Sequence, residues 1–89
     1  MPQVTFAQSI QTHVPCPPQT VEGATVREAL EASFRADPRL RGYVLDDQGD
    51  LRANVVVFID GRRCHDRHRL DDALAPASHV HVLQALSGG

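Results

Sequence analysis

The residues with the clearest chemical meaning stand at the end of the sequence, where Ser87, Gly88 and Gly89 follow Leu86. Because glycine has no Cβ, the Gly88-Gly89 pair accepts most backbone conformations and is no wider than the backbone itself. Such a segment can thread a narrow channel into the active site of another protein. We therefore expect the chemistry to take place on the carboxylate of Gly89, with residues 87–89 as the flexible tail that delivers it.

A carboxylate is a poor electrophile, because its charge is delocalised and its oxygen is a bad leaving group. Conversion to an acyl-adenylate removes this barrier, and a terminal glycine leaves the acyl carbon unshielded by a side chain. The alternative is that a terminal glycine pair is a frayed end without function. Here the pair follows the last predicted strand without a polar linker, and this position favours the reactive interpretation.

Histidines and a cysteine offer a second kind of chemistry. Cys64, His65 and His68 fall within five residues, and His79 and His81 point the same way from one predicted strand. Zinc ligands, however, normally come as two pairs of closely spaced residues, with C-x₂₋₄-C or H-x₃₋₅-H spacing. Only the weaker half of that pattern is present in this sequence. We expect exposed hairpin and edge residues here, and no metal site.

The two cysteines, Cys16 and Cys64, are not expected to act as nucleophiles. Cys16 lies between prolines at a position predicted to be exposed, and neither thiol has the basic surroundings at a helix N-terminus that lower a thiol pKa. The sequence also contains no nucleotide-binding glycine loop, paired-carboxylate motif or serine-nucleophile elbow. The chain is therefore expected to be a substrate and carrier, and not an enzyme.

Length and composition limit the remaining possibilities. A chain of 89 residues is expected to form one domain, because it buries only about 60 to 65% of its unfolded surface. The net charge of -2 does not provide the clustered excess of positive charge that binds nucleic acid. No apolar run approaches the roughly 18 residues that span a membrane, and no signal peptide opens the chain, so a cytoplasmic location is expected.

All nine basic residues are arginines, and the sequence contains no lysine. Genomic base composition is one explanation. The other is that a protein with an activated C-terminus gains from having no internal lysine amine to acylate. The absence of lysine is consistent with the expected chemistry but does not establish it.

One helix is predicted with clear boundaries, from Thr25 to Asp37. Its apolar and small residues follow the helical repeat at Val26, Ala29, Leu30, Ser33 and Phe34. Thr25 and Glu28 have the spacing of a capping box, in which each side chain accepts a backbone N–H from the other residue. Pro38 forces Asp37 out of helical geometry and ends the helix.

The other apolar runs predict strands. These are Gln3 to Ile10, Gln19 to Glu22, Tyr43 to Leu45, Val55 to Ile59 and His79 to Leu86. The run Val55 to Ile59 is unbroken and β-branched, which predicts a strand buried on both faces. One helix packed across one face of a mixed sheet is an α+β arrangement. The compact fold known for this arrangement is the β-grasp.

Shorter features complete the expected fold. Turns are predicted at Asp46 to Asp50 and at Asp60-Gly61, and a single helical turn at Leu70 to Leu74. The core is expected to use Phe6, Phe34 and Phe58 as its large fillers.

Two segments resemble those of a known family. They are Asn54 to Gly61, with the letters NVVVFIDG, and Val80 to Gly89, with the letters VHVLQALSGG. Together with the placement of the helix, they resemble the MoaD/ThiS family of ubiquitin-like sulfur-carrier proteins across essentially the whole chain. The resemblance implies a ubiquitin-like β-grasp domain over residues 1–89 with a reactive Gly-Gly tail.

The resemblance also implies a function. An ATP-dependent activating enzyme, MoeB/ThiF-like, adenylates Gly89, and a sulfur donor converts it to a thiocarboxylate. The carrier then gives sulfide to a sulfur-accepting synthase in the biosynthesis of molybdopterin, thiamine or another sulfur-containing cofactor or metabolite. ATP is used by the partner, and the chain itself is expected to bind no cofactor. Leu86, Leu83 and Phe6 are the expected partner-binding patch.

The sequence departs from the family pattern at two positions. Many members have proline where this chain has Gln84, and alanine where it has Ser87. Neither change touches the acyl carbon. The same tail also fits an alternative function, a ubiquitin-like protein modifier conjugated through Gly89 to lysines of other proteins. A third interpretation is an interaction module whose tail is idle.

Overall fold

The computed structural model describes residues 1–84, and residues 85–89 lie outside the described part of the chain. Five strands form one mixed sheet in the order β2-β1-β5-β3-β4. The strands are β1 (Gln3–Phe6), β2 (Gln19–Thr20), β3 (Val55–Ile59), β4 (Arg62–Arg63) and β5 (His79–Gln84). The strands β1 and β5 run parallel at the centre, and every other neighbouring pair is antiparallel.

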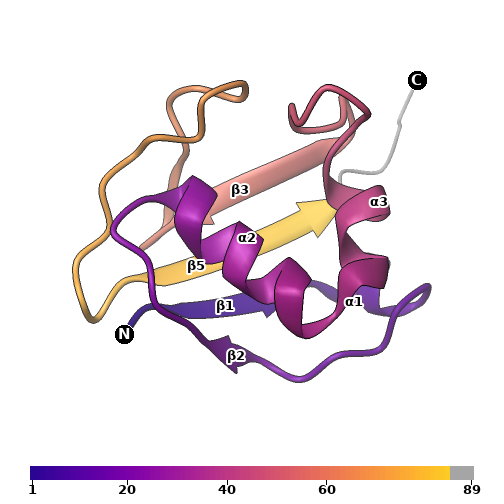
Figure 1. The fold of residues 1–89 in the computed structure, drawn as a ribbon, viewed down its shortest axis with the longest axis horizontal. Helices are drawn as coiled ribbons and strands as arrows, with labels where there is room; N and C mark the ends of the chain where they lie inside the picture. The colour runs from indigo at the N-terminus through magenta and orange to yellow at the C-terminus, as the bar shows by residue number, and fades with distance from the viewer. Residues whose placement is uncertain (85–89) are drawn as a thin grey trace.

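The long helix α2 (Val26–Ala36) crosses one face of this sheet (Figure 1). Its inward side chains pack against the inward side chains of the strands, and most of them are almost fully buried. They include Val26, Ala29, Leu30 and Phe34 from the helix, and Val4, Phe6, Val55, Val57, Ile59, Val80 and Val82 from the strands. The α+β arrangement expected from the sequence, with one helix across a mixed sheet, is confirmed.

The start of α2 confirms most of the predicted capping box. Thr25 Oγ1 accepts the N–H of Glu28 at 3.2 Å. The Glu28 carboxylate, however, accepts the N–H of Ala24 at 2.9 Å, and not that of Thr25 as predicted. Two otherwise unsatisfied N–H groups are still paired at this end. The helix ends as expected before Pro38, where a short 3-10 helix (Pro38–Leu40) begins.

The first strand is shorter than the sequence suggested. It ends at Phe6, and a one-turn helix, α1 (Gln8–Gln11), follows. The carbonyl of Ala7 accepts the N–H groups of Ile10 and Gln11, which turns the chain and brings Ile10 into the core at 1% exposure. The spacing of Phe6 and Ile10 fits one helical turn as well as it fits a strand, so the apolar pattern alone could not separate the two.

The strand predicted at Tyr43 to Leu45 is wrong, because this segment is the one-turn helix α3 (Arg41–Val44). Leu40 and Val44, four residues apart, are both fully buried, which is the helical repeat. The turn predicted at Asp46 to Asp50 is confirmed. Asp46 Oδ1 accepts the N–H of Gln48 at 2.8 Å and that of Asp50 at 3.1 Å.

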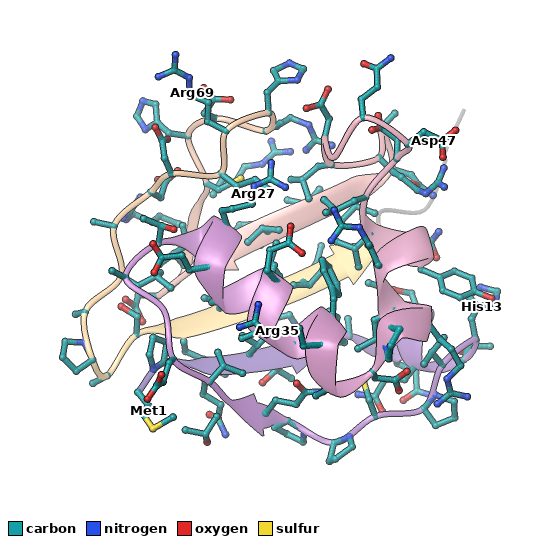
Figure 2. All side chains as sticks on the ribbon, in the orientation of Figure 1. Met1, His13, Arg27, Arg35, Asp47 and Arg69 are labelled. Carbon is teal, nitrogen blue, oxygen red and sulfur yellow. The ribbon has the colours of Figure 1, made fainter. Side chains whose placement is uncertain are left out.

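The helical turn predicted at Leu70 to Leu74 is also wrong. Leu70 is fully buried with a φ of 55°, and the chain then runs beside the start of α2. There Leu74 donates its N–H to the carbonyl of Ala24 at 2.9 Å. Arg27 points from α2 toward the loop that carries Arg69 (Figure 2) and donates to the carbonyl of His68 at 2.6 Å. Contacts with α2, and not a local helical repeat, therefore hold this loop.

The third strand is buried on one face only. Val55, Val57 and Ile59 are buried against α2, whereas Val56 and Phe58 are half-buried on the opposite face. The predicted burial on both faces is therefore wrong, and Phe58 is not a core filler. Within residues 1–84 no second layer covers that face (Figure 1). The Asp60-Gly61 hairpin turn is confirmed, with φ values of 50° and 89° that suit a type I′ turn.

Candidate functional site

The predicted reactive tail, residues 87–89, comes shortly after the central strand of the sheet in the sequence. Strand β5 lies between β1 and β3, and its last residue, Gln84, pairs with Val55. The backbone N–H of Gln84 donates to Ser9 Oγ at 3.3 Å, which joins the end of β5 to α1. Ser87, Gly88 and Gly89 lie outside the described residues. Gly89 is the fifth residue after Gln84, so the chain between them spans at most about 18 Å.

The described residues of the expected partner patch lie on opposite faces of the sheet. Phe6 is 1% exposed and packs in the core, so its assignment to an exposed patch is wrong. The reason is the register of β1, in which Phe6 pairs with the buried Val82 and faces α2. Leu83 lies half-buried on the opposite face of the sheet, where a partner can contact it. Leu86 lies outside the described residues.

The face of the sheet opposite α2, which we call the outer face, gathers residues that the sequence analysis had not connected. It is formed by Thr5, Val56, Phe58, Arg63, His79, His81 and Leu83. A shallow hollow on this face is lined by Phe58, Asp60, Gly61, His79, His81 and Leu83. Alternate residues of a strand face opposite sides of the sheet, so the order of residues in β3 could have indicated the outer face. All five residues of β3 are apolar, however, and the sequence therefore did not show which of them face outward.

The two histidines of β5 lie side by side on the outer face. Their ring centroids are 6.0 Å apart, which confirms that they point the same way. His79 Nε2 lies 2.7 Å from the hydroxyl oxygen of Thr5, on the neighbouring strand. This contact orients the His79 ring across the sheet.

The loop after β4 does not bring its candidate ligands together. Cys64 packs half-buried against the core, whereas His68 points to Asp50, with Nδ1 to Oδ2 at 3.0 Å. The hydrogen bond to Asp50, helped by its charge, raises the pKa of His68. In residues 1–84 no three histidine, cysteine, aspartate or glutamate side chains converge in a way that could hold a metal ion.

Both thiols are held in the protonated form. Cys16 is buried and not exposed as predicted, and this burial, followed by the negative charge of Asp37, raises its pKa. Burial and the charge of Asp72 likewise raise the pKa of Cys64. The structure therefore gives no activated thiolate among the described residues.

None of the helices in residues 1–84 is long and apolar enough to cross a membrane.

Comparison with known proteins agrees with this architecture. The model of the ThiS family matches residues 10–89. SAMP1 from Haloferax volcanii has 25% sequence identity and a TM-score of 0.80, over 99% of this chain and 98% of that one. A search of curated protein sequences found no match.

Two further structures share the fold at lower identity. A chain of the Amycolatopsis orientalis BexX/CysO complex has 16% identity and a TM-score of 0.82, with all of both chains covered. Mycobacterium tuberculosis CysO has 16% identity and a TM-score of 0.81, over 97% of this chain and all of that one. The ubiquitin-like β-grasp predicted from the sequence is confirmed.

Proposed function

The chain belongs to the ThiS family, and from this premise we propose that it is a ubiquitin-like sulfur carrier that bears its sulfur on Gly89. The observation that carries the proposal is the extent of the family match, which runs from residue 10 to residue 89 and so includes the Gly88-Gly89 pair. The likeness to the CysO structures supports the fold on which such a tail is presented.

The proposed cycle has two chemical steps on the Gly89 carboxylate. An oxygen of the carboxylate attacks the α-phosphorus of ATP in an activating enzyme of the MoeB/ThiF type, and pyrophosphate leaves. A sulfide equivalent from the sulfur donor then attacks the acyl carbon, and AMP leaves with the displaced oxygen. The product is a thiocarboxylate, whose sulfur passes to an acceptor in a sulfur-accepting synthase.

The described residues contribute position and not catalysis to this cycle. Strand β5 is paired on both sides and tied to Ser9, so it presents the start of the tail from a rigid base. The thiols of Cys16 and Cys64 have raised pKa values and do not compete for the activated acyl group. The chain is therefore proposed to act as a co-substrate of its partner enzymes.

A second candidate function is a protein modifier that remains attached to lysines of other proteins through Gly89. The likeness to SAMP1 favours it, because related structures of this set are described as small archaeal modifier proteins. The absence of lysine is relevant here, since the only ordinary amine on the chain is that of Met1. A chain of this kind offers no side-chain amine on which it could build branched polymers of itself.

The test is the mass of the C-terminal tryptic peptide from protein purified without a C-terminal tag from its native host. Cleavage after Arg69 releases residues 70–89, which contain neither methionine nor cysteine. Replacement of oxygen by sulfur adds about 16 Da, and oxidation of those two residue types cannot imitate this change in that peptide. Fragment ions then assign the added mass to Gly89.

Each outcome of this measurement decides between the candidates. A heavier peptide with the change at Gly89 supports the sulfur carrier. An unmodified peptide, together with peptides in which Gly89 is joined to a lysine of another protein, supports the modifier. An unmodified peptide without conjugates, from cells that express the partner enzymes, would contradict both.

A further inference from the structure

Strand β2 forms one edge of the sheet (Figure 1), and part of its backbone is open. It pairs with β1, and no strand lies beyond it among residues 1–84. Val21 donates its N–H to the carbonyl of Pro2 at 2.9 Å, so its backbone groups face β1. Successive residues of an edge strand point their backbone groups to opposite sides, so the N–H and carbonyl of Thr20 point away from the sheet. An extended segment that lies beside β2 can therefore bond to both groups of Thr20.

A hollow of about 570 Å³ lies between this edge and the helix α2. Val21 lines it from the strand, and Ala32 and Ala36 line it from the helix. The two alanines are four residues apart and therefore lie on the same side of α2. Because their side chains are short, the space beside Val21 is left open. Aliphatic side chains of a segment added to β2 fit this space, since alternate residues of such a segment face α2.

One polar atom in this hollow has no partner. Gln19 lines the hollow, and its side-chain oxygen, Oε1, is buried without a hydrogen-bond donor in the described part of the chain. A buried acceptor without a donor is unfavourable, and most such atoms in folded proteins are paired. A ligand that brings an N–H or hydroxyl group into the hollow removes this cost. The hollow therefore suits a segment with polar hydrogens, and not a purely apolar ligand such as a lipid chain.

The charges at the rim of the hollow favour an acidic ligand at one end. Arg35, which projects from the last part of α2 (Figure 2), is exposed and forms no ion pair within residues 1–84. Glu22 lies toward the start of α2, where Ala24 donates its N–H to the side chain of Glu28. An acidic residue of the ligand is therefore attracted at the Arg35 end and repelled at the Glu22 end.

We propose that β2 and this hollow bind an extended segment of a partner protein, in which aliphatic and polar residues alternate and aspartate or glutamate stands at one end. The segment adds to the sheet as a further strand through Thr20. Its aliphatic side chains fill the hollow, one of its polar hydrogens bonds to Gln19 Oε1, and its carboxylates meet Arg35. The contact is short, because Pro17 and Pro18 precede β2 and have no N–H to donate.

This surface is separate from the end of β5, and the inference does not depend on the proposed function. Strand β2 pairs with Gln3 and Val4, which on their other side pair with the first two residues of β5. Gln84, the last described residue, is at the opposite end of β5. A segment bound to β2 therefore leaves that end of the sheet uncovered. For a sulfur carrier, such a contact would hold the chain near an enzyme that acts on Gly89.

Binding of synthetic peptides, followed by NMR of the 89-residue chain, tests this surface. In the probe peptides threonine and valine alternate, and two aspartates stand at the N-terminal end of one probe and at the C-terminal end of the other, because an edge strand accepts both directions. With at least one probe, the backbone amide of Thr20 and the side-chain amide of Gln19 should show saturable shifts. The amides of Arg62 and Arg63 in β4, the other edge strand, should not shift. Absence of shifts at Thr20 and Gln19 with both probes would overturn the proposal.

The backbone of the probe separates strand addition from simple apolar binding. N-methylation of its amides removes the hydrogen-bond donors and keeps the side chains, so it should weaken binding about tenfold or more. Equal affinity of the methylated and unmethylated probes would show that the hollow takes up side chains without any extension of the sheet. That result would contradict the proposal.

Charge reversal tests the acidic end of the ligand. Arg35→Glu should weaken binding of the probe about tenfold, because the aspartates then meet a like charge. Arg63→Glu is the matched control, since Arg63 is also exposed and without an ion pair in residues 1–84 but lies on β4, and it should leave the affinity unchanged. Circular dichroism of both variants verifies that the fold is retained. Equal affinity of Arg35→Glu and the wild type would overturn the assignment of an acidic segment.

The oligomeric state decides between a partner protein and a second copy of the chain. Sedimentation of the chain alone, at the concentration of the NMR experiment, should give a monomer. A dimer that the probe dissociates would mean that β2 of one copy pairs with β2 of another. In that case the proposed partner segment would be wrong.

Discussion

The backbone N–H of Gln84 donates to the hydroxyl oxygen of Ser9 at 3.3 Å, so the last described residue of β5 is tied to a helix from the beginning of the chain. Figure 1 shows α1 beside the end of the sheet at which β5 terminates. The bond lies at the base of the proposed reactive tail. It fixes the end of β5, which is the last described part of the chain.

Removal of this bond is expected to loosen the end of β5. In Ser9→Ala the Gln84 amide loses its acceptor, so its hydrogen exchange should become faster, while global stability falls by about 1 kcal/mol or less. Thr12→Ala is the control, because the hydroxyl of Thr12, at the end of the same short helix, donates to the carbonyl of Gln8 and not to β5. Amide exchange followed by NMR measures both. Equal exchange rates at Gln84 in Ser9→Ala and the wild type would contradict the prediction.

Phe6 is predicted to be a stability residue and not a contact residue. Since its side chain is 1% exposed among core residues, Phe6→Ala should lower the free energy of unfolding by about 3 to 5 kcal/mol. Leu83→Ala, on the half-buried outer face, should cost clearly less. Urea denaturation of the two variants provides the comparison. Similar costs for both would mean that the two faces of the sheet are equally covered in solution.

Gly23 is predicted to tolerate no side chain. A Cβ at this position would lie 2.8 Å from the backbone nitrogen of Ala29 and 3.1 Å from its Cα, and the backbone of α2 cannot move away easily. Gly23→Ala should therefore destabilise the protein by about 1 to 3 kcal/mol.

Gly42 provides the matched control for this clash. It lies in α3, and a Cβ there would meet nothing within 4 Å. Gly42→Ala should be neutral or stabilising by up to about 1 kcal/mol, because alanine loses less backbone entropy in a helix. Thermal unfolding of the two variants is the measurement. A stable Gly23→Ala variant would show that the loop before α2 lies farther from the helix than the structure places it.

The ion pair between His68 and Asp50 predicts a dependence of stability on pH. The partner raises the pKa of His68 in the folded protein, so the pair contributes fully when the pH is below the unfolded value of about 6.5. The contribution is lost as the pH rises through the folded value. Because the His68 side chain is 77% exposed, the effect should be small.

The measurement is the difference in urea midpoint between the wild type and His68→Gln, followed from about pH 5.5 to pH 8.5. This range brackets the ordinary titration of a histidine, so the experiment follows the protonation of His68. The difference should be largest at the acidic end and should disappear at the alkaline end. A difference that grows with pH would contradict the assignment of the pair.

The sequence predicted correctly those elements whose boundaries depend on local chemistry. The limits of α2 follow from a threonine cap and from Pro38, and the hairpin after β3 follows from the positive φ that Asp60 and Gly61 adopt. The apolar runs of β3 and β5 are long enough to identify strands, although not the face that each strand buries. These signals act within a few residues, so they can be read without knowledge of the rest of the chain.

Interpretation by sequence alone failed where a short segment depends on distant contacts. The segments of α1 and α3 are four residues long, and a helix of one turn is not stable by itself. Ile10 and Val44 form helical turns because burial in the core holds them there. Cys16 is buried for the same reason, although the prolines around it suggested an exposed loop.

The sequence alone identified the family and predicted a site at the Gly88-Gly89 pair, because both depend on the linear order of residues. Only the tertiary structure decided that Phe6 faces the core and that Phe58 lies beside His81 on an open surface. The physical reason is that alternation along a strand divides its residues between two faces, but it does not say which face is buried when both carry apolar residues. Which face is covered depends on where the single long helix packs, and here α2 covers one side of the sheet only.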